Sequence, residues 1–392
     1  MSGFVGDLSE KQSKALDELQ SRLNGVEFPG PENDDRDAYL LKWLRARQFD
    51  VGKAEFMLKN HLSFREKWNV QSLIDNWHPP EVLDKYMVGG LCGFDKDGAP
   101  VWYEPFGYFD PKGLVLSTTG NDLMKMKIKI CEEILSQLRA QTKKLGKRID
   151  RFVIVFDLEK AGLSHIWKPF IDRYNLILQV FEAHYPEMLK KTFVINAPAF
   201  FSIGFNLIKK FLSEETKNKV SVLGGNYKDV LIEAIGKDLP AHFGGTACDP
   251  DGDPRCVSKI RFGGKVPESY YLKNEFMHEG RLTEVFIGHG SKLELTYEVK
   301  EKDHVLKWEF MTRHNNIGFG VFYKPSPDTS RDQWEEVVEK TRCSCHLVPE
   351  IGGYSCDKLG TYIVHFDNSF SWVRGKKVFY LIELQKEEDH ES

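Results

Sequence analysis

Residues 185–225 decide the fold of this chain, and they read YPEMLKKTFVINAPAFFSIGFNLIKKFLSEETKNKVSVLGG. Residues 192–196 are a short run of β-forming residues between turn formers, which is typical of a buried strand. Ala197 and Pro198 then break the chain. Residues 199–212 follow with helical periodicity, so the stretch predicts a strand, a turn and a helix.

The predicted helix is apolar on two sides. One stripe at helical spacing contains Phe201, Phe205, Ile208 and Leu212, and a second beside it contains Phe200, Ile203, Leu207 and Phe211. Together they cover about twice the roughly 100° arc that a core-facing helix needs. Such a helix requires two apolar environments, a protein interior and either a ligand cavity or a membrane surface. The alternative is a helix buried around most of its circumference.

The composition limits the classes of function. The chain has 392 residues, 41% hydrophobic and 29% charged, which suits a protein of two or three domains with a sizeable core. The net charge of −4 gives no overall attraction to nucleic acid. No run of about 18 apolar residues is present, so any membrane contact is expected to be peripheral.

The N-terminal region and the cysteines indicate a cytoplasmic protein. The first residues, MSGFVGDLSEKQ, lack the basic start and apolar core of a signal peptide, and Ser2 stands where myristoylation needs glycine. Seven cysteines, an odd and scattered number, fit a reducing compartment.

Periodicity divides the chain into four parts. Residues 1–75 read as an all-α lobe. Residues 76–246 alternate strands with helices, and the continuous apolar run at 152–156 suits a mainly parallel sheet covered on both faces. Residues 247–275 are rich in turn formers and read as a linker. Residues 276–392 show regular strand alternation with glycine turns, which predicts a β-sandwich.

Motifs for catalysis are absent from the sequence. There is no nucleotide-binding glycine loop, no HExxH and no GxSxG. Cys343, Cys345, His346 and Cys356 lie close in sequence, but their CxC spacing is not that of a usual zinc site. We therefore expect no enzyme, no cofactor and no metal.

A binding function follows from the apolar pattern. A sheet floor closed by an apolar helix makes a dry cavity that can hold a hydrophobic molecule. The expected cavity residues are Val153, Val155, Ile195, Phe201, Phe205, Leu207 and Ile208. The expected lid surface and membrane contacts are Phe200, Ile203, Phe211 and Leu212.

Several motifs also resemble known domains. YPE, INAP, KKFLSEETKNKV, LGGNY and LPAHFGG resemble the CRAL-TRIO lipid-binding domain, and LLKWLRARQFDVGKA resembles the helical lobe that precedes it. HVLKWEFMTRHNNIGFGVFYK and TYIVHFDNSFSWVRGKKVFYLIEL resemble the GOLD sandwich of Golgi-trafficking proteins. The three-part order is similar to the animal group of supernatant protein factor, tocopherol-associated protein and invertebrate retinal-binding proteins.

The resemblance implies a carrier in which residues 199–215 form a lid over one lipid of the phosphatidylinositol, tocopherol, squalene or retinoid class. It implies exchange of that lipid at membranes. As an alternative, it implies an adaptor that binds Golgi or vesicle proteins through the GOLD domain.

The resemblance also implies a headgroup site. In yeast-type phosphatidylinositol transfer members, four positions hold the inositol phosphate, and by motif match they fall on Arg47, Glu187, Thr216 and Lys219. The alternative is an ordinary salt bridge between Arg47 and Glu187 that joins the two lobes.

Overall fold

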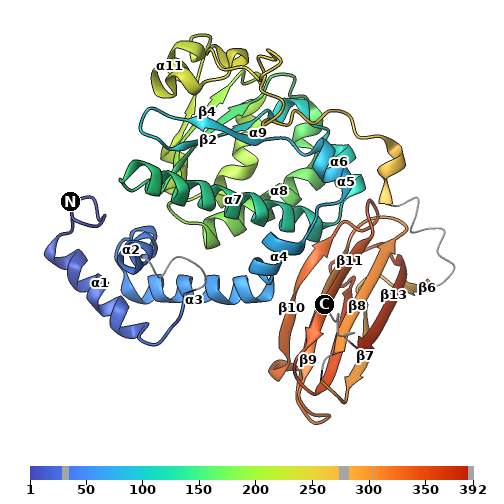
Figure 1. Ribbon diagram of the computed structural model, residues 1–392. Helices are drawn as coiled ribbons and strands as arrows, with labels where there is room; N and C mark the ends of the chain where they lie inside the picture. The colour runs from blue at the N-terminus through green and yellow to red at the C-terminus, as the bar shows by residue number, and fades with distance from the viewer. Residues whose placement is uncertain (29–34, 273–281, 303, 387–392) are drawn as a thin grey trace. The chain divides into compact units, whose positions relative to one another are not determined.

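The computed structural model describes residues 1–392 except 29–34, 273–281, 303 and 387–392 (Figure 1). It divides into two compact units. The first contains residues 1–111 and 124–265, and the second contains residues 112–123 and 266–392. The predicted start of the sandwich, at 276, lies outside the described residues.

The first unit begins with the helical lobe that the sequence predicts. Its helices are α1 (Glu10–Arg22), α2 (Arg36–Ala46), α3 (Val51–Lys67), α4 (Val70–Asn76) and α5 (Glu81–Tyr86). Ser9, Asp35 and Asp50 cap the first three by accepting backbone hydrogen bonds. Leucines and Trp43 from these three helices form a core without solvent contact.

The central sheet has five strands, and its mainly parallel α/β architecture confirms the predicted fold class. Its strands lie in the order β1 (Gly90–Phe94), β2 (Pro100–Glu104), β3 (Phe152–Asp157), β4 (Leu189–Ile195) and β5 (Val220–Val222). The first pair is antiparallel and the other pairs are parallel. A turn at residues 95–98 joins the first pair, where Asp95 Oδ1 accepts the backbone N–H groups of Asp97 and Ala99.

Helices cover both faces of this sheet (Figure 1). They are α7 (Gly120–Leu145), α8 (Lys168–His184), α9 (Phe201–Ile208), α10 (Glu214–Asn218) and α11 (Tyr227–Ala234). Short 3₁₀ turns η3 (Leu163–Ile166) and η4 (Lys209–Phe211) precede α8 and follow α9. The helix expected over residues 199–212 is therefore one α-helix of two turns that tightens into a 3₁₀ turn.

The two faces of the sheet are packed differently. Val153, Val155 and Ile195 lie on one face in a solid core that includes Leu231 and Ile235, from α11 and its C-cap. Their sequence neighbours on β3 and β4 point to the other face, because strand side chains alternate. The second face meets α7, α8 and α9 and is only partly filled.

The stretch expected as a linker, residues 247–275, packs in part onto the first unit. Cys256 and Ile260 are buried in the same core as β3. Arg261 pairs with Gly89 in an isolated β-bridge. Turn-forming residues here build a packed, irregular segment.

The second unit contains the all-β sandwich that the sequence predicts. Two four-stranded antiparallel sheets have the orders β10-β9-β12-β7 and β11-β8-β13-β6. The strands are β6 (Thr283–Ile287), β7 (Lys292–Val299), β8 (His304–Thr312), β9 (Ile317–Lys324), β10 (Glu335–Cys343), β11 (Glu350–Cys356), β12 (Gly360–Asp367) and β13 (Lys376–Lys386). Phe310, Phe319 and Phe366 meet between the sheets. Most of helix α6 (Pro111–Ser117) and the first turn of α7 also belong to this unit.

The difference between the two sheet faces gives a stability prediction. Ile195→Ala removes a fully buried side chain from the solid face and should lower the free energy of unfolding by about 2–5 kcal/mol. Ile154→Ala makes the same truncation on β3 beside the partly filled face and should cost less, because the Ile154 side chain already lacks packing partners on the cavity side. Chemical denaturation of both variants measures this, and equal losses would contradict the assignment of faces.

Candidate functional site

A cavity of about 220 Å³ lies on the partly filled face of the sheet, within the first unit. Strands β2 to β5 form its floor, α7 and α8 form two walls, and the α9 segment closes it. Its lining is predominantly apolar and includes Phe152, Ile154, Phe156, Val194, Val220, Ile130, Ile134, Ile177, Leu178 and Phe181. An adjoining cavity of about 60 Å³ lies between η3, α8 and α9 and shares Phe156, Tyr174, Phe201, Phe205 and Ile208 with the first.

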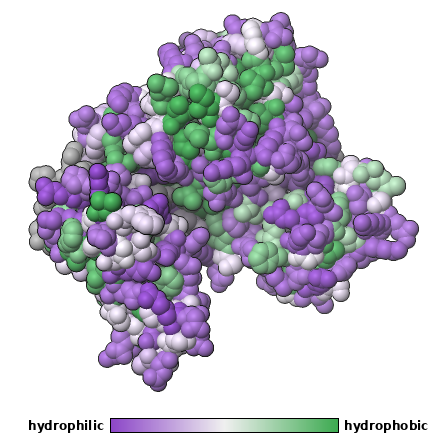
Figure 2. Space-filling model, turned by 180° about the vertical axis from the view of Figure 1, so that it is seen from behind, coloured by the Kyte–Doolittle hydropathy of each residue, from purple (hydrophilic) through white to green (hydrophobic). Residues whose placement is uncertain are grey.

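The closing segment has one side in the cavity and the other in solvent. Phe201 and Phe205 line the cavity with their rings stacked 5.7 Å apart. On the outer side, Ile203 is 56% exposed and Leu207 is 41% exposed. No residue of α9 is fully buried. Figure 2 shows hydrophobic side chains gathered on one face of the α/β part.

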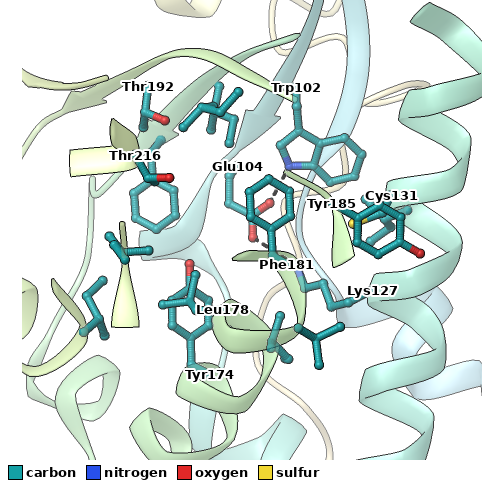
Figure 3. A pocket seen from close by; sticks show the side chains of 18 of the residues that line it. Trp102, Glu104, Lys127, Cys131, Tyr174, Leu178, Phe181, Tyr185, Thr192 and Thr216 are labelled. Carbon is teal, nitrogen blue, oxygen red and sulfur yellow. Dashed lines mark hydrogen bonds and ion pairs between the residues drawn. The ribbon is translucent and has the colours of Figure 1, made fainter. Parts of the chain in front are cut away.

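A buried polar group interrupts the apolar wall (Figure 3). Glu104 Oε2 accepts a hydrogen bond of 2.5 Å from the indole N–H of Trp102. The Lys127 ammonium lies 3.7 Å from Glu104 Oε1, longer than a hydrogen bond, with both side chains largely buried. The hydroxyl end of Tyr174 points toward this pair (Figure 3), and burial raises the pKa of the Tyr174 phenol well above its ordinary value. This part of the wall therefore offers hydrogen-bonding groups to a ligand.

The polar lining also includes two threonines, a thiol and Tyr185, whose hydroxyl donates a hydrogen bond of 3.1 Å to Glu132. Thr192 and Thr216 lie near each other at another side of the cavity from Lys127 (Figure 3). The Thr216 hydroxyl accepts a hydrogen bond of 2.9 Å from Ser213. Burial raises the pKa of the Cys131 thiol to about 12, so this cysteine is an unreactive part of the wall.

The expectation that Val153, Val155 and Ile195 line the cavity is wrong, because they face the solid core on the other side of the sheet. Phe201, Phe205 and Ile208 do line the cavity. Leu207 does not, since its side chain faces solvent.

The four residues expected on the outer surface of the lid also differ in whether they point to solvent or to a cavity. Ile203 is exposed, as a membrane contact requires. Phe200 lines the smaller cavity and Leu212 the larger one, so both point inward. Phe211 is half-buried beneath the ammonium of Lys210, which lies 4.9 Å from the ring centroid.

A second polar cluster joins the helical lobe to the lid segment. Arg45 Nε donates a hydrogen bond of 3.2 Å to Glu187 Oε2, and the two side chains are 10% and 7% exposed. The carboxyl group of Glu215 lies close to Glu187, and it is 2.5 Å from the Lys219 ammonium. Burial and then the Glu215 carboxyl raise the pKa of Glu187. Glu187 has a φ of 65°, a strained conformation for this residue type.

Arg47 does not belong to this cluster. The motif match placed it beside Glu187, but Arg45 occupies that position. Residues two apart on a helix differ in direction by about 200°, so Arg45 and Arg47 cannot share one partner. Arg47 is the C-cap of α2, donates a hydrogen bond to the carbonyl of Ala46, and lines a separate pocket with Lys53 and His184. The expected Arg47–Glu187 salt bridge is thus replaced by Arg45–Glu187.

The other three expected headgroup residues lie near one another in the chain's fold. Glu187 and Lys219 meet through Glu215. Thr216, on α10 between Glu215 and Lys219, turns to the cavity wall. Phe4 covers Arg45 from outside, with its ring centroid 3.9 Å from the guanidinium carbon.

Among the described residues, one group could hold a metal ion: Asp157, Glu159 and His242, whose ligand atoms lie within 4.8 Å of one another. Asp157 is fully buried, and its Oδ1 accepts hydrogen bonds from Asn196 Nδ2 and the Glu159 backbone. Burial raises the pKa of Asp157. Cys343, Cys345, His346 and Cys356 form no such group in the described part of the chain.

The Glu104–Lys127 pair was missed at the sequence level, although a signal exists. Trp102 and Glu104 share one face of β2, while Val101 and Tyr103, on the other face, are fully buried. On α7, Lys127 lies three and four residues before Ile130 and Cys131, in the middle of an apolar stripe. A charged residue at a position that belongs to the apolar face of a helix or strand indicates a buried polar site.

The Arg45–Glu187 pair gives a prediction with a matched control. Arg45→Ala leaves Glu187 buried beside Glu215 without its cation and should lower the free energy of unfolding by about 3–5 kcal/mol. Arg47→Ala, two residues away, should change it by about 0.5 kcal/mol or less. Chemical denaturation of both variants at neutral pH measures the two changes in the free energy of unfolding. A larger loss for Arg47→Ala would restore the original assignment.

Comparisons with known proteins agree with this architecture. A model of the CRAL/TRIO domain matches residues 84–245, a model of the CRAL/TRIO N-terminal domain matches residues 15–60, and the F28H7_8_C:-like C-terminal domain matches residues 269–392. Among the described residues, no helix is both long and apolar enough to cross a bilayer.

Relatives cover most of the chain. Protein ctg-1 of Caenorhabditis elegans is 30% identical over 363 residues, 91% of this chain and 93% of the relative. Protein real-time of Aedes aegypti is 28% identical over 335 residues, 81% of this chain but only 50% of the relative. The crystal structure of Sfh5 shares the fold, with a TM-score of 0.52 at 20% identity over 69% of this chain and 99% of that one. The chain therefore belongs to the CRAL-TRIO family of lipid-binding proteins.

Proposed function

We propose that this protein carries one hydrophobic molecule in the cavity beneath α9 and exchanges it at membranes. The observation that carries the proposal is an apolar cavity between the sheet, α7 and α8, whose closing segment α9 has no fully buried residue. Each methylene moved from water into such a site gains about 0.8 kcal/mol, so an alkyl or polyene chain is held strongly relative to free solution.

The polar group in the cavity wall favours a lipid that is apolar along its length and carries one polar group. The Lys127 ammonium and the Tyr174 hydroxyl can bond one hydroxyl, aldehyde or carboxyl group of the ligand. Among the four expected classes, tocopherols and retinoids have this chemistry, whereas squalene has no polar group.

Exchange at a membrane is favoured by the outer side of α9. Ile203 and Leu207 are exposed there, and Lys209 and Lys210 follow directly on η4. Apolar side chains beside lysines suit the interface of a bilayer. When the segment moves outward, Phe201 and Phe205 leave the cavity, and a membrane is the environment in which their rings can be buried again.

Filling the cavity should abolish ligand uptake. Leu178→Trp places an indole inside the cavity, and Leu176→Trp makes the same change on the exposed side of α8. We expect wild type and Leu176→Trp to bind one lipid per chain after incubation with liposomes, and Leu178→Trp to bind none. Native mass spectrometry with extraction of the ligand measures this.

The proposal fails if the wild-type protein stays empty after incubation with liposomes that contain the candidate lipids. It also fails if Leu178→Trp takes up as much ligand as Leu176→Trp, since the ligand would then lie elsewhere.

The outer side of α9 should control the rate of exchange. Ile203→Ser combined with Leu207→Ser should slow transfer between vesicles by roughly tenfold, because the gain from burying two apolar side chains in the bilayer is lost. The bound fraction at equilibrium should not change, because neither residue lines the cavity. A fluorescent-lipid transfer assay measures the rate. Ile232→Ser on α11, also exposed, is the control, and an equal effect of that change would exclude a specific role for α9.

A further inference from the structure

The loop between β12 and β13, residues 368–375, exposes two apolar side chains at its tip. Trp372 is 91% exposed and Val373 is 82% exposed, the two highest values among the large apolar residues that the structure describes. A tryptophan in open solvent loses most of the stabilisation that its large apolar surface gives when buried. Its exposure here calls for a partner that lies outside the chain.

The loop is held by hydrogen bonds on both sides of its tip. The buried side chain of Asn368 donates from Nδ2 to the carbonyls of Gly288 and Arg374, at 2.9 and 3.0 Å. Ser371 Oγ donates to the Arg374 carbonyl at 2.8 Å and accepts from the Arg374 backbone N–H at 3.4 Å. The Ser371–Arg374 turn therefore presents Trp372 and Val373 without any cost for ordering the loop on binding.

Two exposed arginines, Arg342 and Arg374, and the buried Lys376 lie near this tip. Arg342 lies over the ring of Phe370, with 3.5 Å between the guanidinium carbon and the ring centroid, and the Lys376 ammonium lies 5.8 Å from the same centroid. Arg374 is exposed on the loop itself. Burial and then the charge of Arg342 lower the pKa of Lys376, although Cys345 acts in the opposite direction.

The neighbouring carboxylates do not neutralise these cations. Glu284 pairs with Lys377 at 2.5 Å, and Asp367 pairs with Lys340 at 3.1 Å. Within the described residues, neither Arg342, Arg374 nor Lys376 has a carboxylate within ion-pair distance. The chain as a whole has a net charge of −4, so this positive group is a local feature.

We propose that Trp372 and Val373 insert into the headgroup region of a bilayer that contains anionic lipid, with the exposed Arg342 and Arg374 against the lipid phosphates. Tryptophan prefers this interface because its ring is apolar and its N–H needs a polar partner. Clustered lysine and arginine residues are attracted to the negative surface of such a membrane. A two-residue convex tip is too small for a stable protein interface, which buries about 1,200 Å² or more.

This contact goes beyond the carrier function and does not depend on it. The loop belongs to the sandwich, whereas the cavity and α9 belong to the first unit. A sandwich that binds acidic membranes would select the membrane at which the carrier works and raise its local concentration there.

The test is co-sedimentation of the full chain with vesicles of phosphatidylcholine, with and without phosphatidylserine. Trp372→Ser combined with Val373→Ser should weaken binding to acidic vesicles by roughly tenfold, the loss expected for one aromatic and one aliphatic side chain. Arg374→Gln should weaken it by about fivefold on acidic vesicles and leave binding to phosphatidylcholine alone unchanged. Trp372→Phe should retain most of the binding.

Leu359→Ser is the matched control, because Leu359 is 50% exposed and immediately precedes β12, at the end of that strand opposite the loop. It should bind vesicles like the wild type. All variants change exposed side chains and should keep the wild-type unfolding midpoint.

The proposal is overturned if the Trp372/Val373 double variant binds acidic vesicles as well as the wild type, or if the wild type binds neither kind of vesicle. Native mass spectrometry of the same samples separates the two proposals. The Trp372/Val373 double variant should take up ligand normally. A wild type that binds vesicles through the loop but contains no ligand would refute only the carrier function.

Discussion

The alternation of side chains along β3 and β4 is the constraint on which the site depends. Each strand residue faces either α11 or the helices α7, α8 and α9, and a shift by one position would exchange the two sets. Val155 and Ile195, both without solvent exposure, anchor the sheet to its solid core. Their neighbours Ile154 and Val194 are thereby fixed on the other face, where they form the floor of the cavity. The solid face holds the floor in position while the opposite face stays partly empty.

An unfilled apolar space costs stability, since its lining loses van der Waals partners on one side. The chain accepts this cost over about 220 Å³ and also places Glu104 and Lys127 in the wall. Neither feature stabilises the empty protein, because a buried pair at 3.7 Å, in which only Glu104 has a further hydrogen bond, from Trp102, regains little of its lost hydration. Both features have a physical reason if the space is normally occupied by a molecule that is apolar along its length and polar at one point.

The sequence predicts the three-part architecture well and the side chains of the site less well, for identifiable reasons. Helical and strand periods differ clearly between residues 1–75, 76–246 and 276–392, so the fold class follows from them. Within FVIVF at 152–156, however, every residue is apolar, and nothing in that pattern says which face meets the cavity. The choice of Arg47 over Arg45 failed for a related reason: the motif fixes the pair of arginines, but the end of α2 at Ala46 decides which one reaches Glu187. Glu104 and Lys127 could have been found from the sequence, because each is a charged residue on an otherwise apolar face of its strand or helix.

Polar contacts at the two ends of the closing segment, at Asn196 and at Glu215, determine which part of it is free to move. Asn196, directly after β4, is bonded to the fully buried Asp157, which fixes the start of the segment. Glu215 on α10 pairs with Lys219, directly before β5, at 2.5 Å, which fixes the end of the segment, and Arg45 ties the neighbouring Glu187 to the helical lobe. Between these two points α9 has no fully buried residue. Local opening costs least where few buried contacts are lost, so the middle of the segment can leave the cavity while both strands that flank it stay in the sheet.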